Sequence, residues 1–473
     1  VGPDHLSGLW TTPYGRLLSL KLVLFVAMLG LAAANRFQLT PALGLGLGTL
    51  LAEMGVPRKI VTGHDFRSYS SSIKYALISG LMAAGCEVLD IGLALSPMAY
   101  FGQFALDCPC VAMVTASHNP IDYNGMKLVK AGAAPLDPAT DLAALKALAE
   151  GGAFSDAAPG RVVDASAVRA DYARRVCDFV DAAALPPLRV LVNAGNGAAG
   201  PAFDAIAAEL ARRGAPLDFV RMHHDPDPSF PHGIPNPLLP ENQPVTAEAV
   251  RDHGADLGVA WDGDFDRCFL FDETGRFIPG EYVVGLLAAA FLAREPGARI
   301  VHDPRVVWNT RDVIAEAGGE AVQSRTGHAF VKQTMRAAGA VYGGEMSAHH
   351  YFRDFAFADS GMIPWLLVVA QMGRTGLPLS QLVGARMAAF PSSGEINFRL
   401  GDPDAAIAQV LAAHAGAAEA RDETDGISLA FAGWRFNLRR SNTEPVVRLN
   451  VESRGDAALV AAKVAEIRAL LGA

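Results

Sequence analysis

The chain has 473 residues, enough for three or four domains, and its composition of 51% hydrophobic and 19% charged residues suits a soluble α/β protein. Its net charge of −9 and the lack of a basic stripe with interleaved aromatic residues exclude a nucleic-acid partner. The five cysteines are odd in number and lack the spacing of a metal site, which is typical of a reducing cytoplasm.

The first 43 residues do not match the pattern of the rest of the chain. Residues 17–34 are almost all apolar, lie between Arg16 and Arg36, and reach the short limit for a membrane span. The alternatives are a signal-peptide cleavage site, a buried or amphipathic helix, and a foreign piece acquired by fusion or a misplaced start. This stretch is similar to a segment of copper-resistance-type membrane proteins. We favour a cytoplasmic chain over one tethered to a membrane through residues 17–34.

From Gly44 onward, strands and helices alternate, which predicts α/β sheets covered by helices. The first such unit is expected at residues 44–160, and it ends in a linker. Asp137 is the expected N-cap of a helix that has Pro138 at its first position. The expected strands of this unit are 58–63, 87–91 and 110–114, and the expected helices are 44–54, 72–84 and 138–149.

A polar loop, Thr-Ala-Ser-His-Asn-Pro, follows the third expected strand at residues 115–120. Open α/β sheets bind their ligands at the carboxyl ends of strands. Ser117 and His118, with Lys127 after the next turn, supply the hydroxyl, imidazole and ammonium groups of a phosphoryl-transfer site. An ordinary polar turn explains the same residues equally well.

The second unit, residues 161–276, contains a glycine-rich turn at 193–200 that spells a dinucleotide fingerprint, and Asp218 lies where its ribose acid is expected. We favour a tight turn that brings a helix against the sheet, because one such match is weak in a glycine-rich chain. A loop at 223–240 carries six prolines. The other expected elements of this part are a helix at 165–180 and a strand at 188–192.

Three carboxylates, Asp262, Asp264 and Asp266, alternate along the chain after the expected strand 256–261. They can converge on a hard cation that prefers oxygen ligands. An EF-hand is excluded because Arg267 takes the place of its required glycine and because both flanks are predicted strands. A solvated acidic turn is the alternative. Three carboxylates this close repel one another without a cation, so we favour a metal site.

A glycine-led loop in the third unit, residues 277–388, carries Glu345, Ser347 and His349. A carboxylate that accepts hydrogen bonds from two neighbouring hydroxyls suits sugar recognition, and ordinary hydrogen-bonded loop residues are an equal alternative. Two further polar residues of this unit are Arg305, in the turn after the strand 299–302, and His328, which opens a helix containing Lys332.

The last unit, residues 389–473, is expected to be a smaller α+β domain. Its turn between two strands offers guanidinium, hydroxyl and amide donors, a set that suits a phosphate group. The donors are Arg439, Arg440, Ser441, Asn442 and Thr443. The expected strands are 395–400, 433–438 and 446–452, and the last helix is expected at 456–471.

Together the four motifs resemble those of the α-D-phosphohexomutase family, from Gly44 to the C-terminus. Residues 115–120 resemble its phosphoserine loop, 262–267 its magnesium loop, 345–352 its sugar-specificity loop and 439–445 its phosphate-binding loop. Each match is modest alone, but four in the right order and spacing are strong. The resemblance implies three related α/β domains with mixed sheets and a smaller C-terminal α+β domain around one central cleft.

The resemblance is closest to bacterial phosphomannomutases that feed GDP-mannose synthesis, and it implies interconversion of mannose 6-phosphate and mannose 1-phosphate by a monomer or dimer. Phosphorylated Ser117 is then the phosphoryl donor, a hexose 1,6-bisphosphate is the intermediate and activator, and Mg²⁺ binds Asp262, Asp264, Asp266 and a phosphoserine oxygen. The resemblance also implies acid–base catalysis by Lys127, His118 or His349 and an added cation from Arg267. It implies sugar contacts from Glu345 and Ser347, and weaker substrate contacts from Arg305 and His328. The implied phosphate contacts are Arg439, Ser441, Asn442 and Thr443.

Two departures from the family pattern bear on activity. The family's first strand carries a Tyr-Asp-x-Arg-like motif whose arginine reaches the active site, and residues 1–43 stand in its place here. His64 also occupies a position that is usually arginine. The alternatives are therefore a phosphoglucomutase or dual-specificity mutase, and an inactive phosphosugar-binding homologue. The Glu-Met-Ser loop argues against a phosphoglucosamine mutase.

Overall fold

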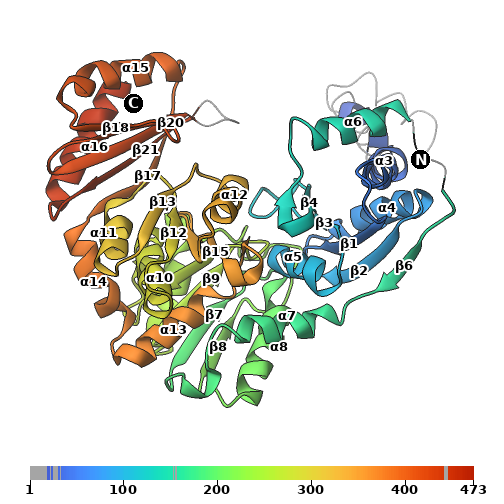
Figure 1. The fold of residues 1–473 in the computed structure, drawn as a ribbon, viewed down its shortest axis with the longest axis horizontal. Helices are drawn as coiled ribbons and strands as arrows, with labels where there is room; N and C mark the ends of the chain where they lie inside the picture. Colours follow the sequence, from blue (N-terminus) through green and yellow to red (C-terminus); the bar gives the residue numbers. More distant parts are fainter. Residues whose placement is uncertain are drawn as a thin grey trace, which may run out of the picture.

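The computed structural model describes residues 19–21, 23–24, 30–31, 34–152, 154, 157–440 and 446–472. Four β-sheets follow one another along the chain, and Figure 1 shows the four units arranged in an arc with the first and fourth at its ends. Three are α/β units with mixed sheets and the last is a smaller unit with an antiparallel sheet, which confirms the expected fold class.

The first sheet has six strands in the order β5-β4-β3-β1-β2-β6. Its central strands are apolar and largely buried, as expected for parallel strands covered on both faces. Strand β6 pairs with β2, so the first sheet extends beyond residue 160. The elements are β1 (Lys59–His64), β2 (Glu87–Leu93), β3 (Cys110–Val114), β4 (Met126–Lys130), β5 (Ala134–Pro135), β6 (Arg161–Asp164), α3 (Thr40–Glu53), α4 (Ser70–Ala83), α5 (Ser96–Ala105) and α6 (Asp141–Gly151).

The expected start of helix α6 is wrong. Its N-cap position is held by Thr140, and the helix begins at Asp141 rather than Pro138. The carboxylate of Asp137 accepts the backbone N–H groups of Ala139 and Thr140 at 2.8 and 3.1 Å. Asp137 therefore closes a separate turn just ahead of the helix, because its side chain satisfies these two donors before helical geometry begins.

The second sheet has the order β11-β10-β9-β7-β8, with β9 and β10 forming an antiparallel hairpin. Both flanks of the carboxylate turn are therefore strands, which confirms the exclusion of an EF-hand. The elements are β7 (Arg189–Asn193), β8 (Asp218–Met222), β9 (Leu257–Trp261), β10 (Cys268–Phe271), β11 (Phe277–Ile278), α7 (Val168–Cys177), α8 (Ala199–Arg212) and α9 (Pro244–Asp252).

The glycines of residues 193–200 lie in close contact with other parts of the protein. A Cβ at Gly197 would lie 2.8 Å from the ring of Phe265, and one at Gly200 would lie 2.0 Å from the carbonyl oxygen of His224. Asp218 pairs with Arg189 at 2.8 Å. The favoured interpretation, a tight turn that lets a helix approach the sheet, is therefore confirmed.

The third sheet has the order β13-β12-β14-β15-β16, and the fourth has the order β17-β21-β20-β19-β18. The third unit contains β12 (Arg299–His302), β13 (Glu320–Gln323), β14 (Tyr342–Gly344), β15 (His350–Phe352), β16 (Ala358–Asp359), α10 (Gly280–Arg294), α11 (Trp308–Glu316), α12 (His328–Ala338), α13 (Pro364–Thr375) and α14 (Leu379–Ala389). The fourth contains β17 (Ser392–Arg399), β18 (Ala420–Asp422), β19 (Ile427–Ala430), β20 (Trp434–Arg440), β21 (Val446–Ser453), α15 (Pro403–His414) and α16 (Ala457–Leu471).

The first three sheets share one topology that positions the motifs. In each, a central strand lies between two parallel neighbours, and one of these neighbours also pairs with an antiparallel strand that follows it in the chain. The three turns that follow β3, β9 and β14 carry the serine, carboxylate and glutamate motifs respectively. Equivalent positions in related sheets thus supply all three loops, at the edge where such sheets bind ligands.

The apolar core also separates the fourth unit from the others. One continuous cluster of buried side chains runs from Val61 in β1 to Val383 in α14, whereas the fourth unit has its own cluster around Phe436. The five cysteines are unpaired and buried. No helix among the described residues has both the length and the apolar character needed to cross a membrane.

Candidate active site

Ser117 lies three residues after β3, with a backbone φ of +50°. A serine rarely adopts this left-handed conformation, which persists only where the surroundings enforce it. Its Oγ lies 3.0 Å from Nδ1 of His118 and donates a hydrogen bond to Oδ2 of Asp262 at 3.3 Å. The serine motif of the first unit and the carboxylate motif of the second therefore meet.

Asp65, which directly follows β1, is fully buried and holds the start of the serine loop. Its Oδ2 accepts hydrogen bonds from the hydroxyl of Thr115 at 2.9 Å and from the backbone of Ala116 at 3.3 Å. Its Oδ1 accepts the hydroxyl of Ser70 at 2.5 Å and the backbone N–H of Arg67 at 3.0 Å. One carboxylate thus joins the loops that follow β1 and β3.

Arg67 holds the rest of the serine loop. Arg67 is 2% exposed, and its guanidinium donates to five main-chain carbonyl oxygens of residues 117–123, at 2.6 to 3.3 Å. The ring of Phe230, from the proline-rich loop 223–240, lies 5.1 Å from its Cζ. A planar cation that offers several N–H donors is well suited to gather carbonyl groups from one loop.

The three carboxylates of the β9–β10 turn form a compact, buried cluster. The ligand oxygens of Asp262, Asp264 and Asp266 lie within 4.8 Å of one another. Oδ1 of Asp264 is buried and accepts no hydrogen bond from any described residue, and Oδ1 of Asp266 is buried with Nε2 of His349 at 3.4 Å. Buried carboxylate oxygens without donors are costly unless a cation compensates them. The residues therefore fit a hard divalent cation such as Mg²⁺.

Protein cations flank the carboxylate cluster on both sides. Lys127 extends from β4 to contact Asp264 at 2.5 Å and Asp266 at 2.6 Å, and Nε of Arg267 donates to Asp262 at 2.8 Å. Burial opposes the charged form of Lys127, but the two carboxylates outweigh it and hold its pKa well above the ordinary value. Burial raises the pKa of Asp262 to about 6, although Arg267 opposes this shift.

His118 has a lowered pKa, unlike its neighbours Lys127 and Arg267. Burial, with the nearby charge of Arg267, lowers its pKa to about 4. Its Nδ1 lies 2.6 Å from Nη2 of Arg267 and 3.0 Å from Oγ of Ser117. A neutral imidazole at this place is able to accept a proton.

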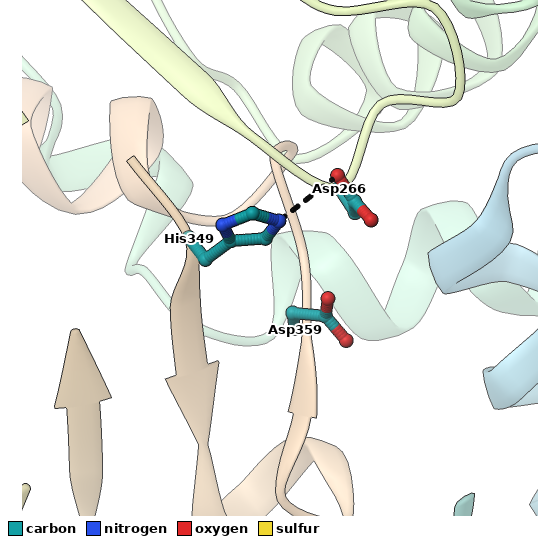
Figure 2. A group of neighbouring side chains, drawn as sticks. All are labelled: Asp266, His349 and Asp359. Atoms are coloured by element: carbon teal, nitrogen blue, oxygen red, sulfur yellow. Dashed lines mark ion pairs between the residues drawn. The ribbon is translucent and has the colours of Figure 1, made fainter. Parts of the chain in front are cut away.

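The loop after β14 brings His349 against the same carboxylate cluster. Figure 2 shows the imidazole pointing toward Asp266 with the carboxylate of Asp359 beside it. Nε2 lies 3.4 Å from Oδ1 of Asp266, and Nδ1 lies 3.2 Å from Oγ of Ser347. Burial disfavours the charged imidazole, but Asp266 outweighs it and holds the pKa of His349 above its ordinary value. His349 therefore connects the β9–β10 turn, which carries the three carboxylates, to Ser347.

Glu345 is buried and oriented by two hydrogen bonds. Its Oε1 accepts the backbone N–H of Gly327 at 2.8 Å, and its Oε2 accepts the hydroxyl of Tyr351 at 2.5 Å. Arg305 donates to Ser347 at 3.2 Å and pairs with Asp303 through both Nε and Nη2. Three candidate substrate-binding residues, Glu345, Ser347 and Arg305, are therefore brought together.

His328 begins α12 beside a buried ion pair. Lys332, one turn further along the helix, lies 2.6 Å from Oδ1 of Asp359 and 4.3 Å from the ring of Tyr100 in α5. Burial, with the charge of Lys332, lowers the pKa of His328 to about 4. Neither Lys332 nor Asp359 was assigned a role from the sequence. The sequence shows Lys332 only as a lysine within a predicted helix and Asp359 only as an acidic residue in a loop, and neither pattern indicates a buried ion pair.

The phosphate motif is described only in part. Arg439 pairs with Glu395 at 3.1 Å, whereas Arg440 points away and pairs with Asp404 at 2.9 Å. Ser441, Asn442 and Thr443 lie outside the described residues.

Three other residues near the site were assigned no role from the sequence. They are Ser96, which donates to Asp264 at 2.6 Å, Asp65 and Arg67. Asp65 and Arg67 could have been found, because they follow a predicted strand at the ligand-binding edge.

Comparison with known proteins agrees with this arrangement. Family models described as phosphoglucomutase/phosphomannomutase alpha/beta/alpha domains I, II and III match residues 32–154, 170–275 and 279–390, and that family's C-terminal domain matches residues 395–470. A model described as copper resistance protein D matches residues 1–54, as the N-terminal resemblance suggested.

Similar proteins cover most of the chain. A phosphomannomutase from Salmonella montevideo is 56% identical over 428 residues, which is 90% of this chain and 94% of that protein. A protein of Xanthomonas campestris named phosphohexose mutases is 52% identical over 437 residues, 92% of this chain and 96% of its own. The crystal structure of a phosphoglucomutase/phosphomannomutase family protein from Burkholderia thailandensis has a TM-score of 0.80 at 29% identity and covers 92% of this chain and 93% of its own. The chain therefore belongs to the phosphoglucomutase/phosphomannomutase family.

Proposed function

We propose that this chain is a phosphomannomutase that interconverts mannose 6-phosphate and mannose 1-phosphate through a phosphoserine at Ser117. The observation that carries the proposal is the meeting of three loops, one from each α/β unit: Ser117 lies beside Asp262, and Asp266 lies beside His349. The names of the similar proteins supply the substrate class. A glucose phosphate is the second candidate substrate, because Glu345 is able to accept hydroxyls of either hexose.

The carboxylates Asp262, Asp264 and Asp266 would hold Mg²⁺ together with an oxygen of phosphorylated Ser117. When bound, this ion would offset negative charge on the transferring phosphoryl group. Arg267, fixed by Asp262, adds a permanent cation next to Ser117. These residues explain how a cleft in an acidic protein accommodates a doubly charged phosphate.

In the forward half-reaction, a sugar hydroxyl attacks the phosphorus of phosphoserine, and the bond from phosphorus to Oγ of Ser117 breaks. The hydroxyl proton passes to a base, for which His118 and His349 are the candidates, and Lys127, which Asp264 and Asp266 keep protonated, is the candidate acid that gives a proton to the leaving Oγ. His349 reaches both the metal loop and Ser347 of the sugar loop, so it is the best placed for the hydroxyl. The resulting hexose 1,6-bisphosphate then returns its other phosphate to Ser117.

Binding of the sugar is assigned to residues from the third and fourth units. Glu345 would accept hydrogen bonds from the sugar hydroxyls, and Ser347 would donate to or accept from them. Arg305 and His328 would make further contacts with the substrate. The phosphate that is not reacting would bind Arg439 with Ser441, Asn442 and Thr443. This phosphate site must accept the sugar in both orientations, and guanidinium and hydroxyl donors to phosphate allow that.

The test is a coupled assay of the purified chain with mannose 1-phosphate, Mg²⁺ and a trace of hexose 1,6-bisphosphate, with intact mass recorded before and after the bisphosphate. We expect turnover and an added mass of about 80 Da on the protein. Added mass without turnover would indicate that the serine and metal residues function without the family's first motif but that sugar handling has failed. Neither signal from a folded protein would support an inactive phosphosugar-binding homologue instead.

A further inference from the structure

Glu395, on strand β17, lies among three arginines. Its Oε2 accepts hydrogen bonds from Arg439 at 3.1 Å and from Arg305 at 3.3 Å, and its Oε1 lies 3.5 Å from Nη1 of Arg448. Arg305 comes from the third unit, whereas Arg439 and Arg448 come from the neighbouring strands β20 and β21. One carboxylate thus gathers guanidinium groups from both sides of the boundary between the third and fourth units.

The three arginines differ in how much of their charge is otherwise compensated. Arg305 has a close second partner in Asp303, and Arg439 has a more distant one in Asp425 at 3.6 Å. For Arg448, Glu395 is the one carboxylate partner within the described part of the chain. Burial alone would raise the pKa of Glu395, but the three arginines hold it below its ordinary value, so it is ionised at neutral pH.

This group is open enough for a ligand to reach. The side chain of Glu395 is 20% exposed and that of Arg448 is 30% exposed. Carboxylate and phosphate both present oxygens that match a guanidinium fork, so the same N–H donors bind either anion. A phosphate carries more charge than a carboxylate and offers more acceptor oxygens. It can therefore take the place of Glu395 on the two arginines of the fourth unit.

We propose that Glu395 is an internal competitor for substrate phosphate, which pairs with Arg439 and Arg448 and yields them when a phosphate group binds. The inference rests on the proposed function, in which this part of the cleft holds the phosphate that is not reacting. That function requires one phosphate of the bisphosphate to leave this site and the other to take its place, because the sugar binds in both orientations. A phosphate on uncompensated guanidinium groups would leave slowly, whereas a carboxylate that returns to them lowers the free energy needed for release.

A purely structural role for Glu395 predicts the opposite effect on affinity. If the carboxylate only orients the three arginines, then its removal disorders them and weakens phosphate binding. If it competes with phosphate, then its removal strengthens binding. The sign of the change therefore separates the two roles, and Glu395→Gln is the suitable variant because the amide has nearly the same shape without the charge.

The chain offers a matched control on the same unit. Asp404 pairs with Arg440 at 2.9 Å, both side chains are more than half exposed, and neither contacts Glu395. Asp404→Asn removes one negative charge from the fourth unit, as Glu395→Gln does, but leaves the three arginines paired. It therefore reports the combined effect of losing one negative charge and freeing one exposed arginine outside the group of three.

The experiment measures binding of inorganic phosphate and of mannose 6-phosphate by calorimetry, without Mg²⁺, in a full-length Ser117→Ala background that cannot turn over. We expect Glu395→Gln to bind inorganic phosphate about tenfold more tightly and Asp404→Asn to leave the affinity unchanged. In the background that retains Ser117, Glu395→Gln should lower KM for mannose 1-phosphate without raising kcat.

Unchanged or weaker phosphate binding in Glu395→Gln would overturn the inference, as would an equal gain in Asp404→Asn. Phosphate binding in none of the variants would also overturn it, because the arginines would then not form a phosphate site. Failure of the proposed function gives a different result: the proteins would bind inorganic phosphate but show no added affinity for mannose 6-phosphate.

Discussion

Nη2 of Arg67 donates a hydrogen bond to the main-chain carbonyl oxygen of Ser117 at 3.1 Å, across fifty residues of sequence. The same guanidinium donates to the carbonyl oxygens of Asn119 and Pro120 at 2.6 and 2.9 Å. A buried side chain from the loop after β1 therefore fixes the backbone of the residue to which we assign the phosphoryl group. It explains how the left-handed conformation at Ser117 is maintained.

Arg67→Lys should lower kcat about 10- to 100-fold, because a single ammonium cannot reach all five carbonyl groups and the serine shifts out of line. KM should change less, since the sugar loop is untouched. Intact mass after incubation with hexose 1,6-bisphosphate should show a smaller phosphorylated fraction. Arg169→Lys is the control, because Arg169 donates to a single described carbonyl, that of Leu93, at 2.8 Å. Equal losses in both variants would mean a general loss of stability.

Ser117→Ala should remove the added mass of about 80 Da and nearly all turnover, because Ser117 is the one hydroxyl among the described residues that donates to Asp262. The protein should unfold at an unchanged urea concentration, since the hydroxyl is only partly buried. Substantial residual mutase activity in the variant would exclude Ser117 as the phosphoryl carrier.

Asp264→Asn should weaken the apparent affinity for Mg²⁺ by at least about tenfold, because it removes a hard anionic ligand whose Oδ1 is buried without a described donor. The measurement is activity against Mg²⁺ concentration, with thermal unfolding followed over the same range. Asp272→Asn is the control, since Asp272 lies in the turn after β10 and accepts hydrogen bonds from Thr274 and Arg276. An unchanged dependence of activity on Mg²⁺ concentration in Asp264→Asn would show that Asp264 is not a metal ligand.

Elements with strong periodicity were predictable from sequence, and their ends were less so. The apolar strand Cys110–Val114 and the hairpin around Asp262 were predicted correctly, because each combines a short buried run with polar residues at its end. The start of α6 was not, because Asp137 satisfies local backbone donors in a turn of its own. Local hydrogen bonding by aspartate competes with helix initiation, and sequence alone does not show which arrangement is more stable.

Motif residues of the site were predictable, and of the residues that support them only those that directly follow a predicted strand, such as Asp65 and Arg67, could have been found. Ser117, Asp262 and Glu345 follow equivalent strands of the three α/β sheets, so each was expected at the ligand-binding edge of its own sheet. Glu395 contacts arginines 44 to 90 residues away along the chain, and no spacing rule links it to these partners. Such contacts depend on how units pack against one another, which composition and periodicity do not specify.

Glu281 in α10 should make stability fall as pH rises from about 4.5 to about 7. Its side chain is 2% exposed, and burial, with the charges of Glu452 and Asp303, raises its pKa to about 7. The unfolded chain loses this proton near pH 4.5, so between the two values unfolding releases a proton and is favoured by higher pH. The loss is up to about 3 kcal/mol.

Glu281→Gln should therefore remove this part of the pH dependence and be more stable than the parent at pH 8. Urea midpoints measured at pH 5.5 and pH 8 for both proteins test this expectation. The amide retains one oxygen for hydrogen bonding and the same shape. Parallel pH profiles for the two proteins would show that Glu281 is ionised in the folded state at both pH values, contrary to the expected shift.

Lys332→Met should destabilise the protein by roughly 3–5 kcal/mol, because it leaves the carboxylate of Asp359 buried without its partner at 2.6 Å. Lys332 is fully buried and also contacts Tyr100 of the first unit, so water cannot replace its charge easily. Adding Asp359→Asn should recover most of the loss, since both charges are then absent and the methionine keeps the packing. The urea midpoints of the two single variants and the double variant measure the coupling. A double variant no more stable than Lys332→Met would show that lost packing, rather than an unpaired carboxylate, causes the destabilisation.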